Sequence, residues 1–237
     1  MAPILMYFLW AMVLGWCLGV PSLLGQTPDP VALLERVKAR HQLVHDFKAE
    51  VAIDVDVDFL RLPVKTAQVF YQQPDRWAFK AKGFLMLPRT GVQFSVAAYL
   101  KEPFSAFYVT STVIDQVLVD VVKIIPLATA NEWVLATLWI DRETALLRRV
   151  EVHTRSTGTY QVNFVYGDAP FDLPVQTAIT FEINRTQLPL KYLGRLQIDP
   201  QKLGDKAQGT VTLTYTQFKV NEGIDEAVFQ ENTSAPE

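Results

Sequence analysis

Three aspartates alternate with apolar residues in the segment FKAEVAIDVDVDF, which covers residues 47–59. Asp54, Asp56 and Asp58 have the chemistry of a cation site, because carboxylates bind hard divalent ions. An EF-hand loop also needs a glycine at its sixth position and a glutamate at its twelfth, and neither stands there in this chain. On a strand, alternate residues lie about 6.6 Å apart, which is too far for all three carboxylates to bind one ion. The segment therefore predicts the solvent-facing side of a long strand.

Two histidines in HQLVH, His41 and His45, have the spacing that places two metal ligands on one face of a helix. Zinc proteases with this spacing carry a glutamate after the first histidine as the general base, and this chain has Gln42. The sequence following residue 26 contains no G-x-S-x-G, P-loop, Rossmann glycine pattern or C-x-x-C. We therefore expect a protein that is not an enzyme and that uses neither a metal nor a cofactor.

The composition is that of an ordered protein with a large core. Hydrophobic residues make up 49% of the 237 residues, and the formal net charge is −3. No cluster of lysine and arginine occurs, which argues against a nucleic-acid partner, because phosphate binding needs a concentrated basic surface. No repeat or linker divides the chain, so residues 27–237 are expected to form one domain.

The first 26 residues contain no charged side chain and predict a secretory signal that is cleaved near Gly25 and Gln26. The alternative is a retained N-terminal anchor, since about 20 apolar residues are enough to span a bilayer. Cys17 is the only cysteine and follows Trp16, whereas a lipidation site needs a small residue there. The exported chain would then have no disulfide to stabilise it.

The rest of the chain predicts a short helix followed by antiparallel strands. Asp29 and Pro30 are typical of a helix start, and the strand patterns that follow are separated by short turns. Apolar pairs that recur every four residues predict a second helix over residues 113–125, with Val117, Leu118 and Val121 on its apolar face. The fold class is mainly β, with about 10–11 strands in one curved antiparallel sheet.

Aromatic and aliphatic residues gather on one face of several predicted strands. A curved sheet of this size has an inner side that its own side chains do not fill, as in half-barrels that enclose apolar ligands. The helix over residues 113–125 would cover the open mouth of this cavity. The candidate ligand-binding residues on the inner face are Val55, Val57, Trp77, Phe79, Phe94, Val96, Phe164 and Phe181.

The order of these pieces resembles the LolA/LolB-type outer-membrane lipoprotein-sorting proteins. Four segments carry the resemblance, and none is a catalytic signature: LLERVKARHQLVHDFKAEV, VFYQQPDRWAF, LWIDRETALLRRVEV and VNEGIDEAVF. The resemblance implies an unclosed β-barrel with a helical lid that binds acyl chains of lipoproteins or other lipids, with Trp77 and Phe79 in the ligand wall. The periplasmic carriers have an arginine before the proline of the second turn, where it holds the lid closed. This chain has Gln73 there and Arg76 three residues later, which makes these two residues the latch candidates.

The resemblance implies a monomeric periplasmic carrier that sorts lipoproteins to the outer membrane. Its partners would be acyl chains and the lipoprotein transport components of the inner and outer membranes. Two alternatives stay open at this point. One is a membrane-anchored, lipid-sensing regulatory protein of the same fold, and the other is a small outer-membrane β-barrel, since alternating strands also suit a lipid-facing wall.

Overall fold

The structure is a computed structural model that describes residues 27–57, 60–81, 96–101, 103–128, 130–184 and 206–230. Its helices are α1 (Pro30–Gln42), α3 (Val96–Tyr99) and α5 (Ala227–Gln230), with one 3-10 turn, η1 (Pro170–Asp172). Its strands are β1 (Asp46–Val57), β2 (Leu60–Arg61), β3 (Lys65–Gln72), β4 (Arg76–Ala81), β5 (Phe104–Ile114), β6 (Val117–Pro126), β7 (Trp133–Asp141), β8 (Leu147–Thr154), β9 (Thr159–Tyr166), β10 (Pro174–Asn184) and β11 (Lys206–Val220).

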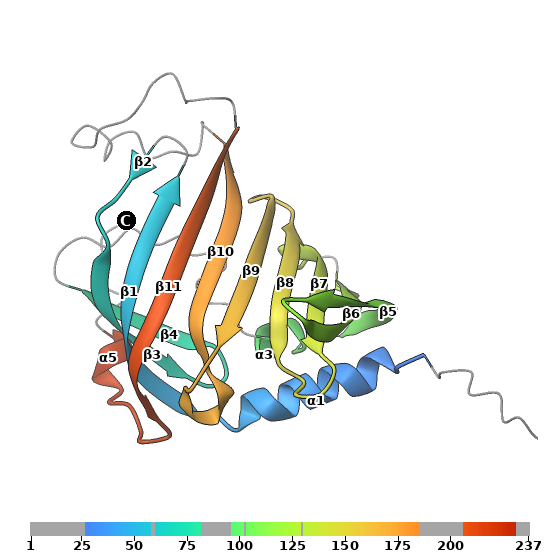
Figure 1. The fold of residues 1–237 in the computed structure, drawn as a ribbon, viewed down its shortest axis with the longest axis horizontal. Coiled ribbons are helices and arrows are strands. Elements are labelled where there is room, and N and C mark those ends of the chain that lie inside the picture. The colour runs from blue at the N-terminus through green and yellow to red at the C-terminus, as the bar shows by residue number, and fades with distance from the viewer. Residues whose placement is uncertain are drawn as a thin grey trace, which may run out of the picture.

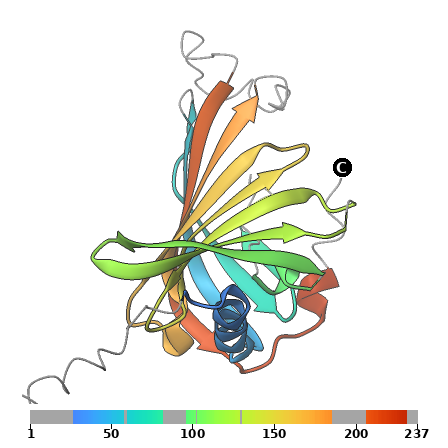
Figure 2. The ribbon, with the colours of Figure 1, turned by 90° about the vertical axis from the view of Figure 1, so that its right-hand side faces the viewer.

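All of these strands belong to one antiparallel sheet (Figure 1). Neighbours follow the order β4-β3-β1-β11-β10-β9-β8-β7-β6-β5, and β2 pairs with β1. Within the described part of the chain, the end strands β4 and β5 do not pair with each other, so the sheet stays open. Figures 1 and 2 show a strongly twisted sheet with α1 lying across its lower end. The curved, unclosed antiparallel sheet predicted from the sequence is confirmed.

Strand β1 follows the alternation seen in the sequence. Its odd positions Val51 and Ile53 are fully buried, while Asp54 and Asp56 are exposed on the other face. At about 3.3 Å per residue, its 12 residues span about 40 Å. The prediction that these aspartates face solvent is confirmed for Asp54 and Asp56, and Asp58 lies outside the described residues.

Helix α1 begins where its capping residues predict. The Asp29 carboxylate accepts a hydrogen bond from the Val31 backbone N–H at 2.9 Å, and Pro30 is the first helical residue. The apolar face of the helix places Leu33, Leu34 and Val37 against the inner face of the sheet, in the main core. The sheet and α1 therefore enclose the core from two sides.

The predicted helix over residues 113–125 is wrong. Residues 104–126 form a β-hairpin, β5 and β6, whose register pairs Ile114 with Val117 (Figure 2). The two turn residues Asp115 and Gln116 have φ angles of 48° and 66°, and positive φ at both central residues is typical of the tight two-residue turn that fits the right-handed twist of a hairpin. The β-branched side chains of this segment favour a strand, and they outweigh the helical period.

Two further predictions need correction or fall outside the description. The alternating apolar residues of GVQFSVAAYL predict a strand over residues 91–100, and this prediction is wrong where the structure describes the segment, because Val96–Tyr99 is a short helix, α3. The segment LKYLGRLQI, residues 190–198, also has a strand pattern. It lies outside the described residues, as do residues 82–95, which include Phe94.

Candidate functional site

A cavity of about 140 Å³ lies between the inner face of the sheet and α1. The C-terminal half of α1 forms one wall, the inner faces of β1, β3, β4, β9, β10 and β11 form another, and η1 and the β7–β8 turn close the rim. The residues that line it are Val37, Arg40, His41, Val44, Phe47, Tyr71, Trp77, Val96, Ala145, Leu146, Leu147, Phe164, Tyr166, Phe171, Asp172, Leu173, Pro174, Thr177, Tyr215 and Phe218. Apolar and aromatic residues dominate this wall, as in sites for apolar ligands.

Aromatic rings in contact with one another form the floor of the cavity. Phe47, at the start of β1, contacts Tyr71 at 5.4 Å, Trp77 at 5.8 Å and Phe218 at 6.0 Å between ring centroids. Phe218 in turn contacts Tyr215 at 6.0 Å. These residues belong to four strands that are neighbours in the sheet, so the sheet order places them together.

The polar groups of this wall are largely satisfied within the protein. The Tyr71 hydroxyl donates to the Pro74 carbonyl at 3.2 Å and lies 3.0 Å from Nε2 of His41. Burial lowers the pKa of His41, which keeps its imidazole neutral at pH 7, and burial raises the pKa of Tyr215 to about 12. Within the described residues, the buried indole N–H of Trp77 has no hydrogen-bond partner.

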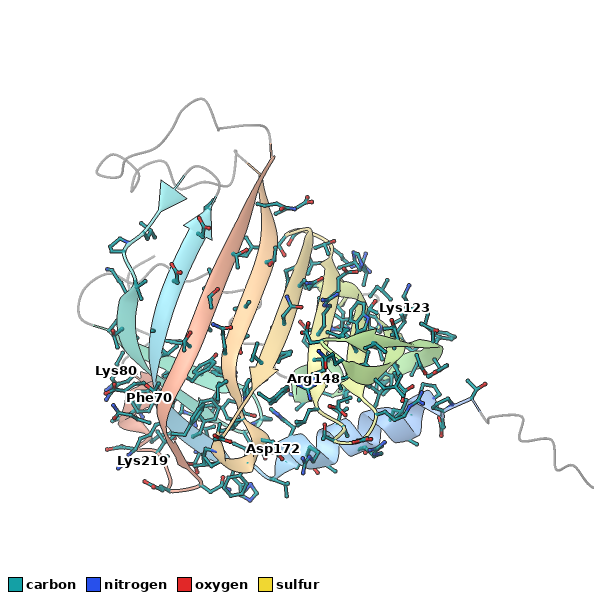
Figure 3. All side chains as sticks on the ribbon, viewed as in Figure 1. Phe70, Lys80, Lys123, Arg148, Asp172 and Lys219 are labelled. Atoms are coloured by element: carbon teal, nitrogen blue, oxygen red, sulfur yellow. The ribbon has the colours of Figure 1, made fainter. Side chains whose placement is uncertain are left out.

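The charged side chains of the cavity wall lie at its rim. Arg40 of α1 and Asp172 of η1 form an ion pair with 2.5 Å between Nη2 and Oδ2. Figure 3 shows Asp172 in the loop beside α1. Among the described residues that line the cavity, this pair carries the only formal charges when His41 is neutral. One turn earlier, Arg36 donates to the carbonyls of Arg142 and Glu143 in the β7–β8 turn, at 3.0 and 3.1 Å.

The structure brings together some of the sequence-predicted ligand residues and places others elsewhere on the same face. Trp77, Val96 and Phe164 line the cavity. Val55, Phe79 and Phe181 are partly buried and pack against the core outside the cavity wall. Val57 is buried, and with Phe181 it packs over Gly209 of β11. Phe94 lies outside the described residues.

The expected lid helix does not exist, and its three residues lie on strand β6. Leu118 is 43% exposed and Val121 only 5%, which fits opposite faces of a strand and not one face of a lid helix. None of Val117, Leu118 and Val121 lines the cavity. The helix that covers the cavity is α1, which the sequence predicts as a helix without a covering role.

Gln73 holds the end of α1. Its side-chain amide donates toward the carbonyls of His41, Gln42 and Val44, at 3.3, 3.3 and 2.8 Å. The His41 carbonyl also accepts a hydrogen bond from the Val44 backbone N–H at 3.3 Å, and no glycine follows to close the helix with a left-handed cap. Asn221 adds a second tie by donating to the Leu43 carbonyl at 2.9 Å.

Arg76 has a different setting from Gln73. It forms an ion pair with Glu226 at 2.5 Å, and its guanidinium lies 4.4 Å from the ring centroid of Phe229. Phe229 belongs to α5 and packs with Phe70 and Ala78, away from the cavity. Arg76 therefore fastens α5 to the sheet, whereas Gln73 contacts the end of α1.

The described residues also bear on two other kinds of site. No group of three or more histidine, cysteine, aspartate or glutamate side chains lies close enough together there to hold a metal ion. Within the same described ranges, no helix has the length and apolar character needed to cross a membrane.

Solved structures with the same fold include three with close overall agreement. A domain described as an outer-membrane lipoprotein-sorting protein from Vibrio parahaemolyticus has a TM-score of 0.56 at 11% identity, over 86% of this chain and 97% of its own. A LolA-superfamily protein from Nitrosomonas europaea has a TM-score of 0.57 at 10% identity, over 87% and 99%. A DUF1329-family protein from Desulfovibrio piger has a TM-score of 0.55 at 10% identity, over 87% and 99%. No family model matches the sequence, and no curated protein matches it.

Proposed function

We propose that this chain, which has the LolA-like fold, is a binding protein that holds lipid acyl chains in the cavity beneath α1. The observation that supports this proposal most strongly is an aromatic-floored cavity between the inner face of an open sheet and one amphipathic helix. No catalytic role is proposed, since no constellation of nucleophile and base has been found among the described residues that line the cavity.

The energetics suit a carrier. Moving a 16-carbon acyl chain from water into an apolar cavity gains on the order of 10 kcal/mol, at about 0.8 kcal/mol per methylene. Moving the same chain from a membrane gains almost nothing, because both environments are apolar. Loading and release then depend on small differences in how firmly the cavity is closed.

The closing element in this proposal is α1. Its outer ties are polar contacts near the surface: Arg36 with the β7–β8 turn, Arg40 with Asp172, and Gln73 with the end of the helix. Exposed ion pairs and hydrogen bonds of this kind are individually weak, so they can break without unfolding the sheet. The cavity of about 140 Å³ is close to the roughly 150 Å³ that holds a benzene molecule. We therefore take this state as closed, with α1 moving away when a longer chain enters.

In its fuller form, the proposal describes an exported carrier for lipoproteins or a related lipid. Residues 27–237 would form one lipid-binding domain, released in the periplasm by cleavage near Gly25 and Gln26. It would act as a monomer that exchanges its cargo with transport components of the inner and outer membranes. The sequence resemblance and the shared fold support this form.

The proposal is tested by native mass spectrometry of the protein purified from its exported fraction without detergent. We expect an added mass that extracts into organic solvent and fragments into fatty acids. The matched variants are Phe164→Asp, inside the cavity, and Val165→Asp, next to it on the exposed face. Circular dichroism confirms that both are folded, and only Phe164→Asp is expected to lose the bound lipid. A bare polypeptide after incubation with lipid membranes would contradict the proposal.

A further inference from the structure

The ion pair between Arg40 and Asp172 marks the chemistry of the ligand that this cavity takes. Both side chains line the cavity, and they are 40% and 51% exposed, so they lie where the cavity meets solvent. His41, Tyr71 and Tyr166 of the wall form hydrogen bonds within the protein, and the buried indole N–H of Trp77 carries no charge. Arg40 is therefore the one fixed cation at the entrance, in the part of the chain that the structure describes.

Asp172 is held against Arg40 by an unusual piece of backbone. Phe171 and Asp172 have φ angles of 56° and 51°, two consecutive residues in the left-handed region. Such a conformation is unfavourable for a side chain as large as phenylalanine, and it persists only where surrounding contacts maintain it. The Phe171 side chain is 51% exposed although it also lines the cavity. None of the three η1 residues is buried, so contacts at the rim such as the Arg40–Asp172 ion pair maintain this conformation.

The small volume of the cavity requires η1 or α1 to move when a long chain binds, and a movement of η1 would leave the charge of Arg40 without its partner. A cavity of about 140 Å³ holds only a short part of an acyl chain, so a full chain needs η1 or α1 to move outward. Moving η1 takes the Asp172 carboxylate away from Arg40. A guanidinium binds a carboxylate or a phosphate through two parallel hydrogen bonds, and the group that Arg40 binds in this structure is a carboxylate.

We propose that the cavity takes a single-chain lipid with an anionic carboxylate head, a fatty acid, whose carboxylate replaces that of Asp172 on Arg40 while its chain lies on the aromatic floor. This inference rests on the proposed acyl-chain binding and adds the class of head group. In the empty protein, Asp172 occupies the position that the ligand carboxylate takes.

The test compares palmitate with methyl palmitate, which has the same chain and no charge. Binding is measured by the intrinsic fluorescence of Trp77 and its neighbours at pH 8, where palmitate is ionised. The variants are Arg40→Met, which keeps length without charge, and Asp172→Asn, which removes the competing carboxylate. Arg36→Met is the matched control, because Arg36 lies one turn earlier on α1 and bonds the rim without lining the cavity.

We expect Arg40→Met to lower the ratio of palmitate affinity to methyl palmitate affinity by up to about 5-fold, because an ion pair at an exposed rim contributes at most about 1 kcal/mol. Arg36→Met loosens α1 alike for both ligands and should leave this ratio unchanged. Asp172→Asn should tighten the binding of both ligands, because the ion pair with Arg40 no longer has to break when η1 moves.

Three results would overturn the inference. Equal losses for both ligands in Arg40→Met would show that Arg40 only holds η1 and α1 together. No change in the affinity for either ligand in that variant would show that its charge does not meet the head group. Tighter binding of a single-chain lysophosphatidate than of palmitate would replace the carboxylate by a phosphate. If the unmodified protein binds neither palmitate nor methyl palmitate, the proposed acyl-chain binding itself fails.

Discussion

The side-chain amide of Gln73 lies 2.8 Å from the carbonyl oxygen of Val44, just beyond the last turn of α1. Gln73 stands at the turn between β3 and β4, so one uncharged side chain joins the sheet to the helix that covers the cavity. The sequence resemblance identified this position as a latch, and the structure shows which groups it contacts. The role of Gln73 in opening the cavity is a prediction.

Replacing Gln73 with methionine should lower the free energy of unfolding by about 1–2 kcal/mol, because the carbonyls at the end of α1 lose a side-chain amide donor. Amide hydrogen exchange in α1 should also become faster. Gln68→Met is the control, since Gln68 is exposed on β3, away from α1. Equal urea midpoints and equal exchange in the two variants would contradict a tie between Gln73 and α1.

Gln116→Gly distinguishes the hairpin from a helix by the sign of its effect. In the hairpin, Gln116 has a φ of 66°, which costs an L-residue roughly 1–2 kcal/mol that glycine avoids. In the middle of a helix the same change would cost about 1 kcal/mol. We expect urea unfolding to show a stabilisation of about 1 kcal/mol, while Thr112→Gly, on the adjacent strand, should destabilise. A destabilised Gln116→Gly would contradict the two-residue turn.

Gly209→Ala should destabilise the upper part of the inner face. A Cβ at this position would lie 2.9 Å from the Phe181 ring, so the ring or the strand has to shift, at a cost of about 1–3 kcal/mol. Phe181→Leu should recover part of that loss in the double variant. Unfolding free energies of the two single variants and the double variant give the coupling. If the changes in unfolding free energy of the two single variants add up to that of the double variant, the two residues are not in contact.

Low pH should weaken the contact between the β5–β6 hairpin and the β7–β8 turn, because this contact depends on the charge of Asp120. Hydrogen bonds from Arg142 hold the pKa of this buried carboxyl below its usual range, and bonds from Ser111 and Tyr108 act in the same direction. A lowered folded-state pKa means that the stabilisation is present above the unfolded pKa of about 4 and is lost as the pH falls through the folded value.

Asp120→Asn should therefore be less stable than the unmodified protein by about 3 kcal/mol at pH 7. The gap should narrow only below about pH 4, where the carboxyl of the unmodified protein takes up a proton. Unfolding free energies between pH 7 and pH 2.5 provide the measurement. A gap that stays constant over this range would mean that the charge of Asp120 contributes nothing.

The parts of the fold with one buried face could be predicted from the sequence. Strand β1 alternates because only its odd positions face the core, and α1 carries its own capping signals. The β6 strand is buried on both faces over residues 119–122, so it lacks alternation, and its apolar pairs imitate a helical period. Its turn residues Asp115 and Gln116 include no glycine, which removed the usual hairpin signal.

The candidate site could be predicted only in part, because its decisive contacts join distant segments. Trp77 and Phe164 were found from their place on alternating strands. Arg40 and Asp172 lie 132 residues apart in the sequence, and no local sequence pattern predicts their ion pair. The sequence predicted that a helix over residues 113–125 covers the cavity, but α1 covers it. The location of α1 depends on contacts with the β7–β8 turn and η1 that only the fold reveals.

The most direct measurement of the central claim is photo-crosslinking with a palmitate analogue that carries a diazirine near the end of its chain. Peptide mass spectrometry then locates the adducts. The account predicts adducts on the cavity wall, at Phe47, Phe164 and Phe218 or their immediate neighbours, and their loss in excess unlabelled palmitate. Adducts confined to the outer face of the sheet, or adducts that unlabelled palmitate does not displace, would contradict acyl-chain binding beneath α1.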